Sequence, residues 1–371
     1  MRVLMTGGGT GGHVNPAVSI AKTILEMEPD SEIAFVGTSR GIENKLVPRE
    51  GFPLYHIEIQ GLKRSFSLSN LKTLYLALTS VGKAKKLIKE FKPDVAIGTG
   101  GYVCFPVIKA ASQMGIPTFL HESNALPGVA VKALAGSVDA VFTNFEETAK
   151  DIKGAKEVIR TGNPLRAGFS VISRSDARKK LGFDQKYRYS LLSCGGSLGA
   201  RCINREALDV MKRYTSKHPE IHHIHSTGAG NYEAVRAEFE EAGLDRFENL
   251  ELVDYIYDMP NQMAAADLVI NRAGAMLLSE LAMMKKPAIL IPSPNVTDNH
   301  QYKNAKVLSD AGAAVLIQES ELTEGFLADT VAELLENRVK REQMGENFGK
   351  FAIKDSNIRI YNEIKKHCNM K

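Results

Sequence analysis

Short apolar runs alternate with amphipathic segments along this chain, starting at its second residue. Residues 2–5 read as a buried strand, residues 7–12 as a glycine-rich turn, and residues 18–25 carry apolar side chains at helical spacing. Asn15 suits the N-cap of that helix and Pro16 its first position. The chain therefore opens with a strand, a glycine turn and a helix, a unit typical of parallel sheets.

The alternation continues and then starts again in the second half. A strand at 190–193, a glycine-rich turn at 195–199 and a helix from about residue 201 repeat the opening pattern. Further short strands are expected at 33–36, 94–97, 118–120, 140–142, 221–225, 268–270, 288–291 and 314–317. We therefore expect an α/β fold of two Rossmann-like, doubly wound domains with a cleft between them.

Glycine and proline at 162–164 mark the expected linker. This places one domain at 1–163 and another at 164–349, with a C-terminal helix at about 350–371 packing back on the first. A length of 371 residues suits two domains of ordinary size.

Composition narrows the class of protein. Hydrophobic residues make up 44% and charged residues 24%, as in soluble globular proteins, and a net charge of +4 does not indicate nucleic acid binding. The 4 cysteines form no CxxC pair, which fits reduced thiols in a cytosolic enzyme. The apolar run at the start is too short for a signal peptide, and no stretch is long enough to span a bilayer. Any membrane contact should therefore be peripheral.

Each expected domain opens with a glycine loop suited to a phosphate group. Gly7, Gly9 and Gly12 fit GxGxxG spacing, and residues 195–200 read Gly-Gly-Ser-Leu-Gly-Ala. Bare amides at a helix start can hold an anion, so one loop could serve a donor diphosphate and the other an acceptor diphosphate. The alternative for each loop is a tight turn without a ligand.

The second strand bears on the choice of nucleotide. It runs into residues 37–40 without the acid that binds the ribose of NAD, which disfavours NAD, although Arg40 leaves NADP open. His13 adds a titratable group beside the first loop, unless it only caps or orients the helix.

The most informative segment for a donor nucleotide begins at Asn271. Residues 271–275 read Asn-Arg-Ala-Gly-Ala, and Glu280 follows on the expected helix. A carboxylate can accept two hydrogen bonds from a ribose diol, and Asn299 and Gln301 offer amides for sugar hydroxyls. The alternative is a helix with a solvated glutamate, followed by a polar loop.

No DxD pair is present, so there is no obvious carboxylate pair for a divalent metal that bridges a diphosphate, and we expect no cofactor. If the donor is a UDP-sugar, helix N-termini and cations must then stabilise the negative charge on the departing UDP. Arg166 is one candidate cation, and the alternative for Arg166 is a surface salt bridge. His222, His223 and His225 resemble a metal cluster, but no third ligand on their face is evident, so ordinary strand histidines are favoured over zinc.

Residues 61–92 are apolar and basic together, with eight Lys or Arg against one Glu. A basic rim around exposed leucines would bind anionic lipid headgroups, whereas an ordinary amphipathic core helix is the alternative. The candidate patch consists of Leu62, Lys63, Arg64, Phe66, Leu71, Lys72, Leu74, Tyr75 and Leu78.

Together these motifs resemble the MurG family, GT-B glycosyltransferases that make lipid II in peptidoglycan synthesis. The resemblance covers nearly the whole chain. It is carried by TGGGTGGHVNPA (6–17), GTGGYVCFP (98–106), HESN (121–124), GNPLR (162–166), GGSLGA (195–200), NRAGA with the later SE (271–280) and DNHQ (298–301).

The resemblance implies inverting transfer of N-acetylglucosamine from UDP-N-acetylglucosamine to lipid I, releasing UDP, at the cytoplasmic face of the cell membrane. It places the acceptor in the first domain and the donor in the second. On the donor side it implies Arg166, Ser197, Arg272, Ala275, Glu280, His300 and Gln301. On the acceptor side it implies Thr10, Gly11, Gly12, His13, Asn15, Tyr102, His121, Glu122 and Asn124. It also favours the membrane patch.

The sequence departs from the family pattern after Ala275, where Met276 and Leu277 replace small or hydroxylated residues, and at Leu198, which is often polar. Backbone amides must then replace a side-chain hydroxyl contact to the nucleotide.

Inversion needs a base that takes the proton of the acceptor C4 hydroxyl, and His13 or Glu122 is the candidate. His13 is favoured because an ordinary histidine titrates near neutrality. The rival interpretations are another GT-B enzyme (a diacylglycerol glycosyltransferase or a UDP-sugar epimerase), an NADP oxidoreductase, and a catalytically inactive binding module.

Overall fold

The computed structural model describes residues 1–59, 69–166, 168–169, 171–183, 185–296 and 299–369, with only the backbone described for 69–78 and 369. The chain divides into two compact units. Unit 1 is Met1–Arg166 with Ile353–Lys371, and unit 2 is Ala167–Ala352. The division thus falls three residues from the positions expected from the sequence at 163 and 349.

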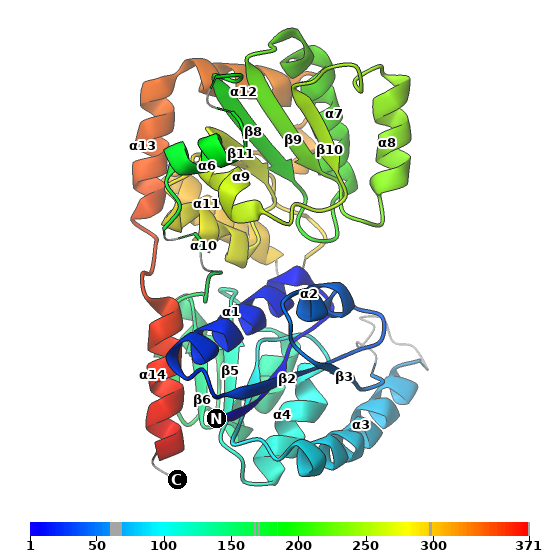
Figure 1. Ribbon diagram of the computed structural model, residues 1–371, viewed down its shortest axis with the longest axis vertical. Helices are drawn as coiled ribbons and strands as arrows, with labels where there is room; N and C mark the ends of the chain where they lie inside the picture. Colours follow the sequence, from blue (N-terminus) through cyan, green and yellow to red (C-terminus); the bar gives the residue numbers. More distant parts are fainter. Residues whose placement is uncertain (60–68, 167, 170, 184, 297–298, 370–371) are drawn as a thin grey trace. The chain divides into compact units, whose positions relative to one another are not determined.

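Among the described residues, unit 1 contains a seven-stranded parallel sheet in the order β3-β2-β1-β4-β5-β6-β7 (Figure 1). Its strands are β1 (Arg2–Thr6), β2 (Glu32–Gly37), β3 (Leu54–His56), β4 (Val95–Gly98), β5 (Thr118–Glu122), β6 (Ala140–Thr143) and β7 (Val158–Arg160). The inner strands are almost wholly buried, as expected for a parallel sheet with helices on both faces.

Helices cover both faces of this sheet. They are α1 (Gly11–Met27), α2 (Glu43–Arg49), α3 (Ser69–Phe91), α4 (Cys104–Gln113), α5 (Val129–Leu134) and α14 (Ser356–Asn369), with the short helices η1 (Ala135–Ser137) and η2 (Glu147–Asp151). Buried side chains of α3, α4 and α5 pack in one core against the sheet. Helix α1 packs beside α14 (Figure 1).

The C-terminal helix is tied to unit 1 by polar contacts. The Asn357 amide donates to the Ser19 and Thr23 hydroxyls, at 3.1 and 3.0 Å, and to the Leu165 carbonyl at 2.9 Å. The Tyr361 hydroxyl donates to Glu28 at 2.9 Å. Residues far apart in the chain therefore complete one unit.

Unit 2 repeats the plan. Its described strands form a six-stranded parallel sheet in the order β10-β9-β8-β11-β12-β13. The strands are β8 (Tyr189–Cys194), β9 (Ile221–Ser226), β10 (Leu250–Val253), β11 (Leu268–Asn271), β12 (Ala288–Leu290) and β13 (Ala314–Leu316). The helices are α6 (Arg174–Lys180), α7 (Arg201–Arg213), η3 (Thr215–Lys217), α8 (Tyr232–Glu241), α9 (Met259–Ala265), α10 (Ala275–Met283), α11 (His300–Asp310), η5 (Glu319–Glu321), α12 (Phe326–Glu336) and α13 (Arg338–Gly349).

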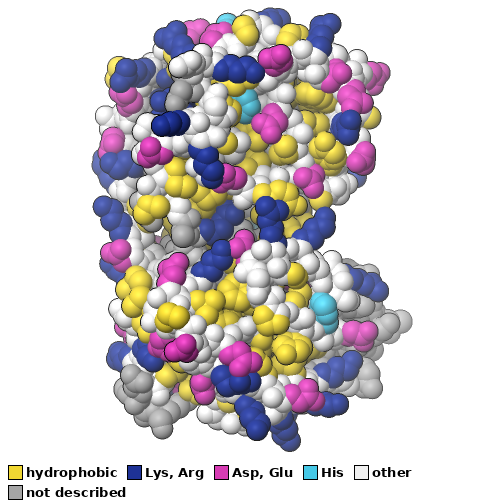
Figure 2. Space-filling view, in the orientation of Figure 1, with side chains coloured by type: hydrophobic (Ala, Val, Ile, Leu, Met, Phe, Trp, Pro, Cys, Tyr) yellow, Lys and Arg dark blue, Asp and Glu magenta, His cyan; other side chains and the backbone are white. Residues whose placement is uncertain are grey.

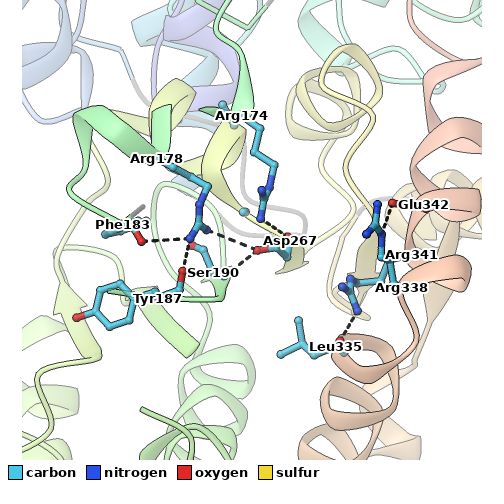
Figure 3. Close-up of polar contacts among 12 residues, drawn as sticks. Arg174, Arg178, Phe183, Tyr187, Ser190, Asp267, Leu335, Arg338, Arg341 and Glu342 are labelled. Atoms are coloured by element: carbon cyan, nitrogen blue, oxygen red, sulfur yellow. Dashed lines mark hydrogen bonds and ion pairs between the residues drawn. The ribbon is translucent and has the colours of Figure 1, made fainter. Parts of the chain in front are cut away.

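Asp267 organises the start of two central strands in unit 2. Its carboxylate accepts the Ser190 amide at 2.9 Å and the exposed Arg174 guanidinium at 2.7 Å, and it lies 3.9 Å from buried Arg178 (Figure 3). Arg178 also donates to the carbonyls of Phe183 and Tyr187 (Figure 3). The buried guanidinium is thus paired and hydrogen-bonded, as a buried charge requires.

Two expectations about helix ends need correction. Helix α1 begins at Gly11 with Thr10 as its N-cap, so Asn15 is not the cap and Pro16 lies inside the helix. The expected C-terminal helix starts later, at Ser356, because α13 ends at Gly349 and a non-helical segment intervenes.

Acidic and basic side chains are interspersed over the face shown in Figure 2, rather than gathered into one field of a single sign. This distribution agrees with the small net charge of +4.

Candidate functional site

The candidate residues gather at equivalent places in the two units. In each sheet the strand order reverses beside the first strand of the unit, between β1 and β4 in unit 1 and between β8 and β11 in unit 2. Ligands of doubly wound folds bind beyond the carboxyl ends of the strands at such a switch point. Both glycine loops and most of the candidate residues lie at these ends.

The first glycine loop, residues 7–10, packs tightly against the turn after β4. A side chain at Gly7 would collide with the Thr99 hydroxyl, and one at Gly101 would collide with the Gly8 carbonyl. The Thr99 hydroxyl donates to the His13 carbonyl at 2.6 Å. These glycines are therefore needed for close backbone approach, which is the property that a phosphate-binding loop requires.

His13 is held by this loop. Its Nδ1 atom lies 3.0 Å from the Gly8 carbonyl oxygen and 3.3 Å from the Thr10 hydroxyl. A carbonyl only accepts, so the neutral ring carries its proton on Nδ1, and Nε2 is the basic nitrogen. The ring packs beside Gly100, where a side chain would lie 2.7 Å from His13 Cδ2. The half-buried ring is thereby held with Nδ1 towards the loop backbone.

Other acceptor-side candidates surround the same loop. Gly11 and Gly12 open α1, and Thr10 precedes them. Asn15, one turn later on α1, is half-buried. A side chain at Gly9 would lie 3.5 Å from the Tyr102 ring, which places that ring against the loop.

Glu122 binds its own loop. One carboxylate oxygen accepts the amide and side-chain N–H groups of Asn124, at 2.9 and 3.0 Å, and the other accepts the Gly128 amide at 2.8 Å. The side chain is buried, with 5% exposed. Three donors thus engage Glu122 in shaping residues 123–128, and this geometry favours His13 over Glu122 as the base.

His121 is fully buried in unit 1. Its Nε2 atom lies 3.1 Å from the Gly162 carbonyl. Burial lowers the pKa of His121 to about 4, so the ring is neutral and donates to that carbonyl. His121 therefore braces residues 162–166, the segment that ends in Arg166.

The second glycine loop is held by β9 and the turn that follows it. Gly199 lies so close to the Thr227 carbonyl that a side chain would collide with it, and its φ of +73° suits glycine. The Asn231 amide donates to the Leu198 carbonyl at 3.1 Å. Ser197 is half-buried on this loop, and Leu198 is 60% exposed.

A chain of buried hydrogen bonds lies beneath this second loop. His223 Nδ1 lies 3.2 Å from the Thr215 hydroxyl, and its Nε2 lies 2.9 Å from the Ser193 hydroxyl. That hydroxyl lies 2.8 Å from His225 Nδ1, and His225 Nε2 lies 3.1 Å from Asn204 Oδ1. Neutral rings satisfy this series of side-chain bonds if Thr215 donates to His223, His223 to Ser193, Ser193 to His225 and His225 to Asn204. His225 Nδ1 also lies 3.1 Å from the Ser193 carbonyl, to which it would donate if protonated.

The pKa values agree with neutral rings. Burial lowers the pKa of His225 to about 4 and that of His223 well below its usual value. The series ends where the Asn204 amide donates to the Thr227 carbonyl at 3.1 Å, beside Gly199.

Among the described residues, no group of three or more metal-ligand side chains is suitably placed to hold a metal ion.

The donor-side candidates follow β11. Gly274 is the N-cap of α10, Ala275 is its first residue, and Glu280 lies on the second turn with 5% of its surface exposed. Arg272 is 8% exposed, donates to the Ile291 carbonyl at 2.9 Å and pairs with Glu319. The guanidinium is thus fixed at the carboxyl ends of the strands.

Helix α11 supplies the remaining pair. His300 begins the helix after Asn299, which has a φ of +51°, and both His300 and Gln301 are half-buried. Gln301 Oε1 accepts the Ser293 amide at 2.9 Å, which leaves its amide N–H group as the donor available for a sugar hydroxyl.

The proposed membrane patch is only partly within the description. Leu62, Lys63, Arg64 and Phe66 lie outside the described residues, and for Leu71, Lys72, Leu74, Tyr75 and Leu78 only the backbone of α3 is described. Among the described residues, no helix combines the length and apolar character needed to cross a bilayer.

Sequence reasoning missed two polar groups that shape the glycine loops. Glu43, fully buried at the start of α2, accepts the Gly9 amide at 3.0 Å. Asn204 links His225 to the backbone beside Gly199. Neither lies in a glycine motif, and their only sequence signal is a polar residue at a position where the helix faces the core.

Comparison with known proteins identifies the family. The chain matches the family model of the glycosyltransferase family 28 N-terminal domain over residues 3–143 and that of the family 28 C-terminal domain over residues 190–360. It is 44% identical to a protein of Acetivibrio thermocellus over 98% of both chains. It is 40% identical to one of Bacillus pumilus over 98% of this chain and 99% of that one. Both are named UDP-N-acetylglucosamine--N-acetylmuramyl-(pentapeptide) pyrophosphoryl-undecaprenol N-acetylglucosamine transferase.

Solved structures agree with these matches. The crystal structure of MurG from Acinetobacter baumannii is 30% identical, covers 98% of this chain and 99% of its own, and has a TM-score of 0.71. The MnaA–UDP structure from S. aureus, at 17% identity and a TM-score of 0.70, shares the fold. With two family models covering most of its length and full-length relatives above 40% identity, the chain belongs to the MurG family of glycosyltransferases.

Proposed function

We propose that this enzyme transfers N-acetylglucosamine from UDP-N-acetylglucosamine to the C4 hydroxyl of the muramyl sugar of lipid I. The products are lipid II and UDP. The observation that carries the proposal is the 44% identity over 98% of both chains to a transferase named for this donor and acceptor. The similar region spans 365 residues and therefore includes both units.

Unit 2 is the donor unit in this proposal. Glu280 accepts the ribose hydroxyls, Arg272 and Ala275 border the base, and His300 and Gln301 meet the sugar. Amides of the second glycine loop and Ser197 offset the charge that develops on the departing diphosphate, and Arg166, the last residue of the first stretch of unit 1, is a candidate for the same role. The support is the gathering of the unit 2 residues at the carboxyl ends of β8, β11 and β12.

Unit 1 is the acceptor unit. The first glycine loop, with Thr10, Gly11 and Gly12, receives the acceptor diphosphate, and Asn15, Tyr102 and Asn124 border the acceptor. His13 Nε2 takes the C4 hydroxyl proton as that oxygen attacks the anomeric carbon and the bond to UDP breaks. The Nδ1–H group held by the Gly8 carbonyl supports this assignment, because it leaves Nε2 as the proton acceptor.

The enzyme acts at the cytoplasmic face of the cell membrane, where α3 and the preceding residues contact anionic lipid. Lys83, Lys86 and Lys89 on the described part of α3 are exposed, while Ala84 and Ile88 face the core, which supports a basic outer face. Sedimentation with vesicles tests this contact: replacing Lys63, Arg64 and Lys72 with Glu should reduce binding to anionic vesicles. A matched triple change of the exposed Lys179, Lys212 and Lys217 in unit 2 should not.

The reaction is tested by incubating the enzyme with UDP-N-acetylglucosamine and lipid I and identifying products by mass spectrometry. Lipid II and UDP in equal amounts are expected. Parallel reactions contain UDP-glucose, a diacylglycerol acceptor, or no acceptor. Transfer to diacylglycerol, or an epimerised UDP-sugar formed without any acceptor, would overturn the proposal. A change in NADPH absorbance with any substrate would favour the oxidoreductase interpretation instead.

A further inference from the structure

Glu43 is a buried carboxylate that reaches across unit 1 to the first glycine loop. It stands at the start of α2, has no exposed surface, and lies 34 residues from the loop that it contacts. One oxygen accepts the Gly9 amide at 3.0 Å. The other accepts the Thr38 amide at 3.0 Å and the Thr38 hydroxyl at 2.8 Å. A buried charge is tolerated only with such partners, so these three bonds fix its position.

The surrounding backbone is shaped to admit this carboxylate. A side chain at Gly8 would lie 2.8 Å from Glu43 Oε1, one at Gly37 would lie 2.7 Å from Glu43 Cγ, and one at Gly41 would collide with the carboxylate. Three glycines from two separate segments therefore leave room for one side chain. Asn44 secures the segment after β2 by donating to the Thr38 and Gly41 carbonyls, at 2.7 and 2.9 Å.

The contact leads directly to His13. Gly9, which Glu43 holds, has a φ of +84° and follows Gly8, whose carbonyl oxygen lies 3.0 Å from His13 Nδ1. Rotation of the Gly8–Gly9 peptide would move that carbonyl away from the ring. A ring without this acceptor can carry its proton on either nitrogen, and the tautomer protonated at Nε2 cannot act as a base through Nε2.

We infer that Glu43 is a positioning residue of the transfer reaction. It fixes the Gly8–Gly9 peptide and thereby keeps the His13 proton on Nδ1 and Nε2 ready to accept one. The inference rests on the proposed function, in which His13 is the base.

The test begins with Glu43→Gln, whose amide group would face one of its three N–H or O–H donors. The kcat for transfer to lipid I should fall at least ten-fold, while the KM for UDP-N-acetylglucosamine stays within two-fold because unit 2 is untouched. Gly41→Ala, which lies outside the glycine loop but presses on the carboxylate, should lower kcat in the same way. Thr38→Val, which removes one donor and leaves the contact with Gly9, should have a smaller effect.

A double-mutant cycle separates positioning from general damage to the fold. Combined with His13→Ala, Glu43→Gln should cause no further loss of kcat, because its effect passes through the missing ring. Losses that multiply would overturn the inference, and so would a Glu43→Gln enzyme with unchanged kcat.

Two measurements do not depend on activity. Hydrogen exchange of residues 6–14 should quicken in Glu43→Gln, and ¹⁵N NMR should show the His13 ring shifting from the Nδ1–H tautomer to a mixture. Unchanged tautomers would contradict the inference even in an inactive preparation. Failure of the wild-type enzyme to act on lipid I, together with the expected tautomer shift in Glu43→Gln, would instead contradict the proposed function and leave Glu43 as the residue that positions the His13 ring.

Discussion

The Nε2 atom of His225 lies 3.1 Å from Oδ1 of Asn204, and the Asn204 amide in turn reaches the Thr227 carbonyl beside the second glycine loop. A neutral histidine donating to an amide oxygen thus stands at the centre of unit 2. Protonation would turn His225 Nδ1 into a second donor, so that it would lose the bond from the Ser193 hydroxyl and could donate to the Ser193 carbonyl, 3.1 Å away. The buried hydrogen bonds behind the second glycine loop therefore change when this ring takes up a proton.

This arrangement predicts that acid weakens unit 2. The pKa of His225 is about 4 in the folded protein, below the ordinary 6.5, so the unfolded chain binds the proton more tightly. The stabilisation is complete above about pH 6.5 and is lost as the pH falls towards 4. Between about pH 7 and 5 this ring should lower the free energy of unfolding by about 2 kcal/mol.

Urea titrations at several pH values measure how the free energy of unfolding of unit 2 depends on pH. His225→Gln should flatten the dependence, because the replacement does not titrate. His218→Gln, at a side chain that is 40% exposed, should leave the slope as in the wild type. A His225→Gln protein as sensitive to acid as the parent would contradict this assignment.

Glu280→Gln should weaken UDP binding at least ten-fold. The replacement removes a charged acceptor from the proposed ribose contact, and hydrogen bonds to charged groups contribute about 1.5–3 kcal/mol. Calorimetric titration with UDP measures the change. Glu241→Gln, at an exposed position at the end of α8, is the matched control and should bind UDP as the parent does. An unaltered Kd in Glu280→Gln would remove this residue from the donor site.

His13→Ala should lower kcat by about 10²–10⁴-fold, the range typical of a lost general base, with UDP affinity unchanged. Glu122→Gln should cost less in kcat and more in thermal stability, because its new amide group would face an N–H donor of residues 123–128. Steady-state kinetics and thermal melts of both variants decide between the two bases. The reverse ranking of kcat would assign the proton transfer to Glu122.

Asp267→Ala should destabilise unit 2 by about 3–5 kcal/mol, because it leaves the buried Arg178 guanidinium without its carboxylate. Urea unfolding measures the loss. Arg338→Ala supplies the contrast, since Arg338 is 80% exposed and its pair with Glu342 lies in solvent (Figure 3). That change should leave the free energy of unfolding nearly unchanged, because solvent screens an exposed pair. Equal losses would mean that burial of the Arg178 pair contributes nothing.

Most inner strands could be predicted because they are short apolar runs, although β9, which reads Ile-His-His-Ile-His-Ser, is an exception. The strands that the sequence analysis missed, β3, β7 and β10, all lie at sheet edges. In β3 two of three side chains are exposed, and β7 ends on the exposed Arg160. An edge strand has one neighbour and less core to face, so its apolar signal can be weak. The edge strand β13 kept an apolar run and was expected from the sequence.

The candidate site was predictable only where local spacing carries the chemistry. The glycine loops and Glu280 belong to motifs that span only a few residues and can be recognised in the sequence. The contacts of His121 with Gly162 and of Glu43 with Gly9 could not be predicted, because the partners lie 41 and 34 residues away in the chain. The start of α1 was misplaced for a related reason: Pro16 suits a first helical turn, yet tertiary contacts of the glycine loop set the start at Gly11.

The return of α14 to unit 1 has a consequence for how the protein is made. Unit 2 is a single uninterrupted stretch, Ala167–Ala352, whereas unit 1 is completed by residues at the far end of the chain. A ribosome therefore finishes all of unit 2 before it supplies the helix that bonds Ser19 and Thr23 through Asn357. Unit 1 is therefore the first unit whose synthesis begins and the last whose fold can be completed. A chain that ended after unit 2 would leave unit 1 without α14.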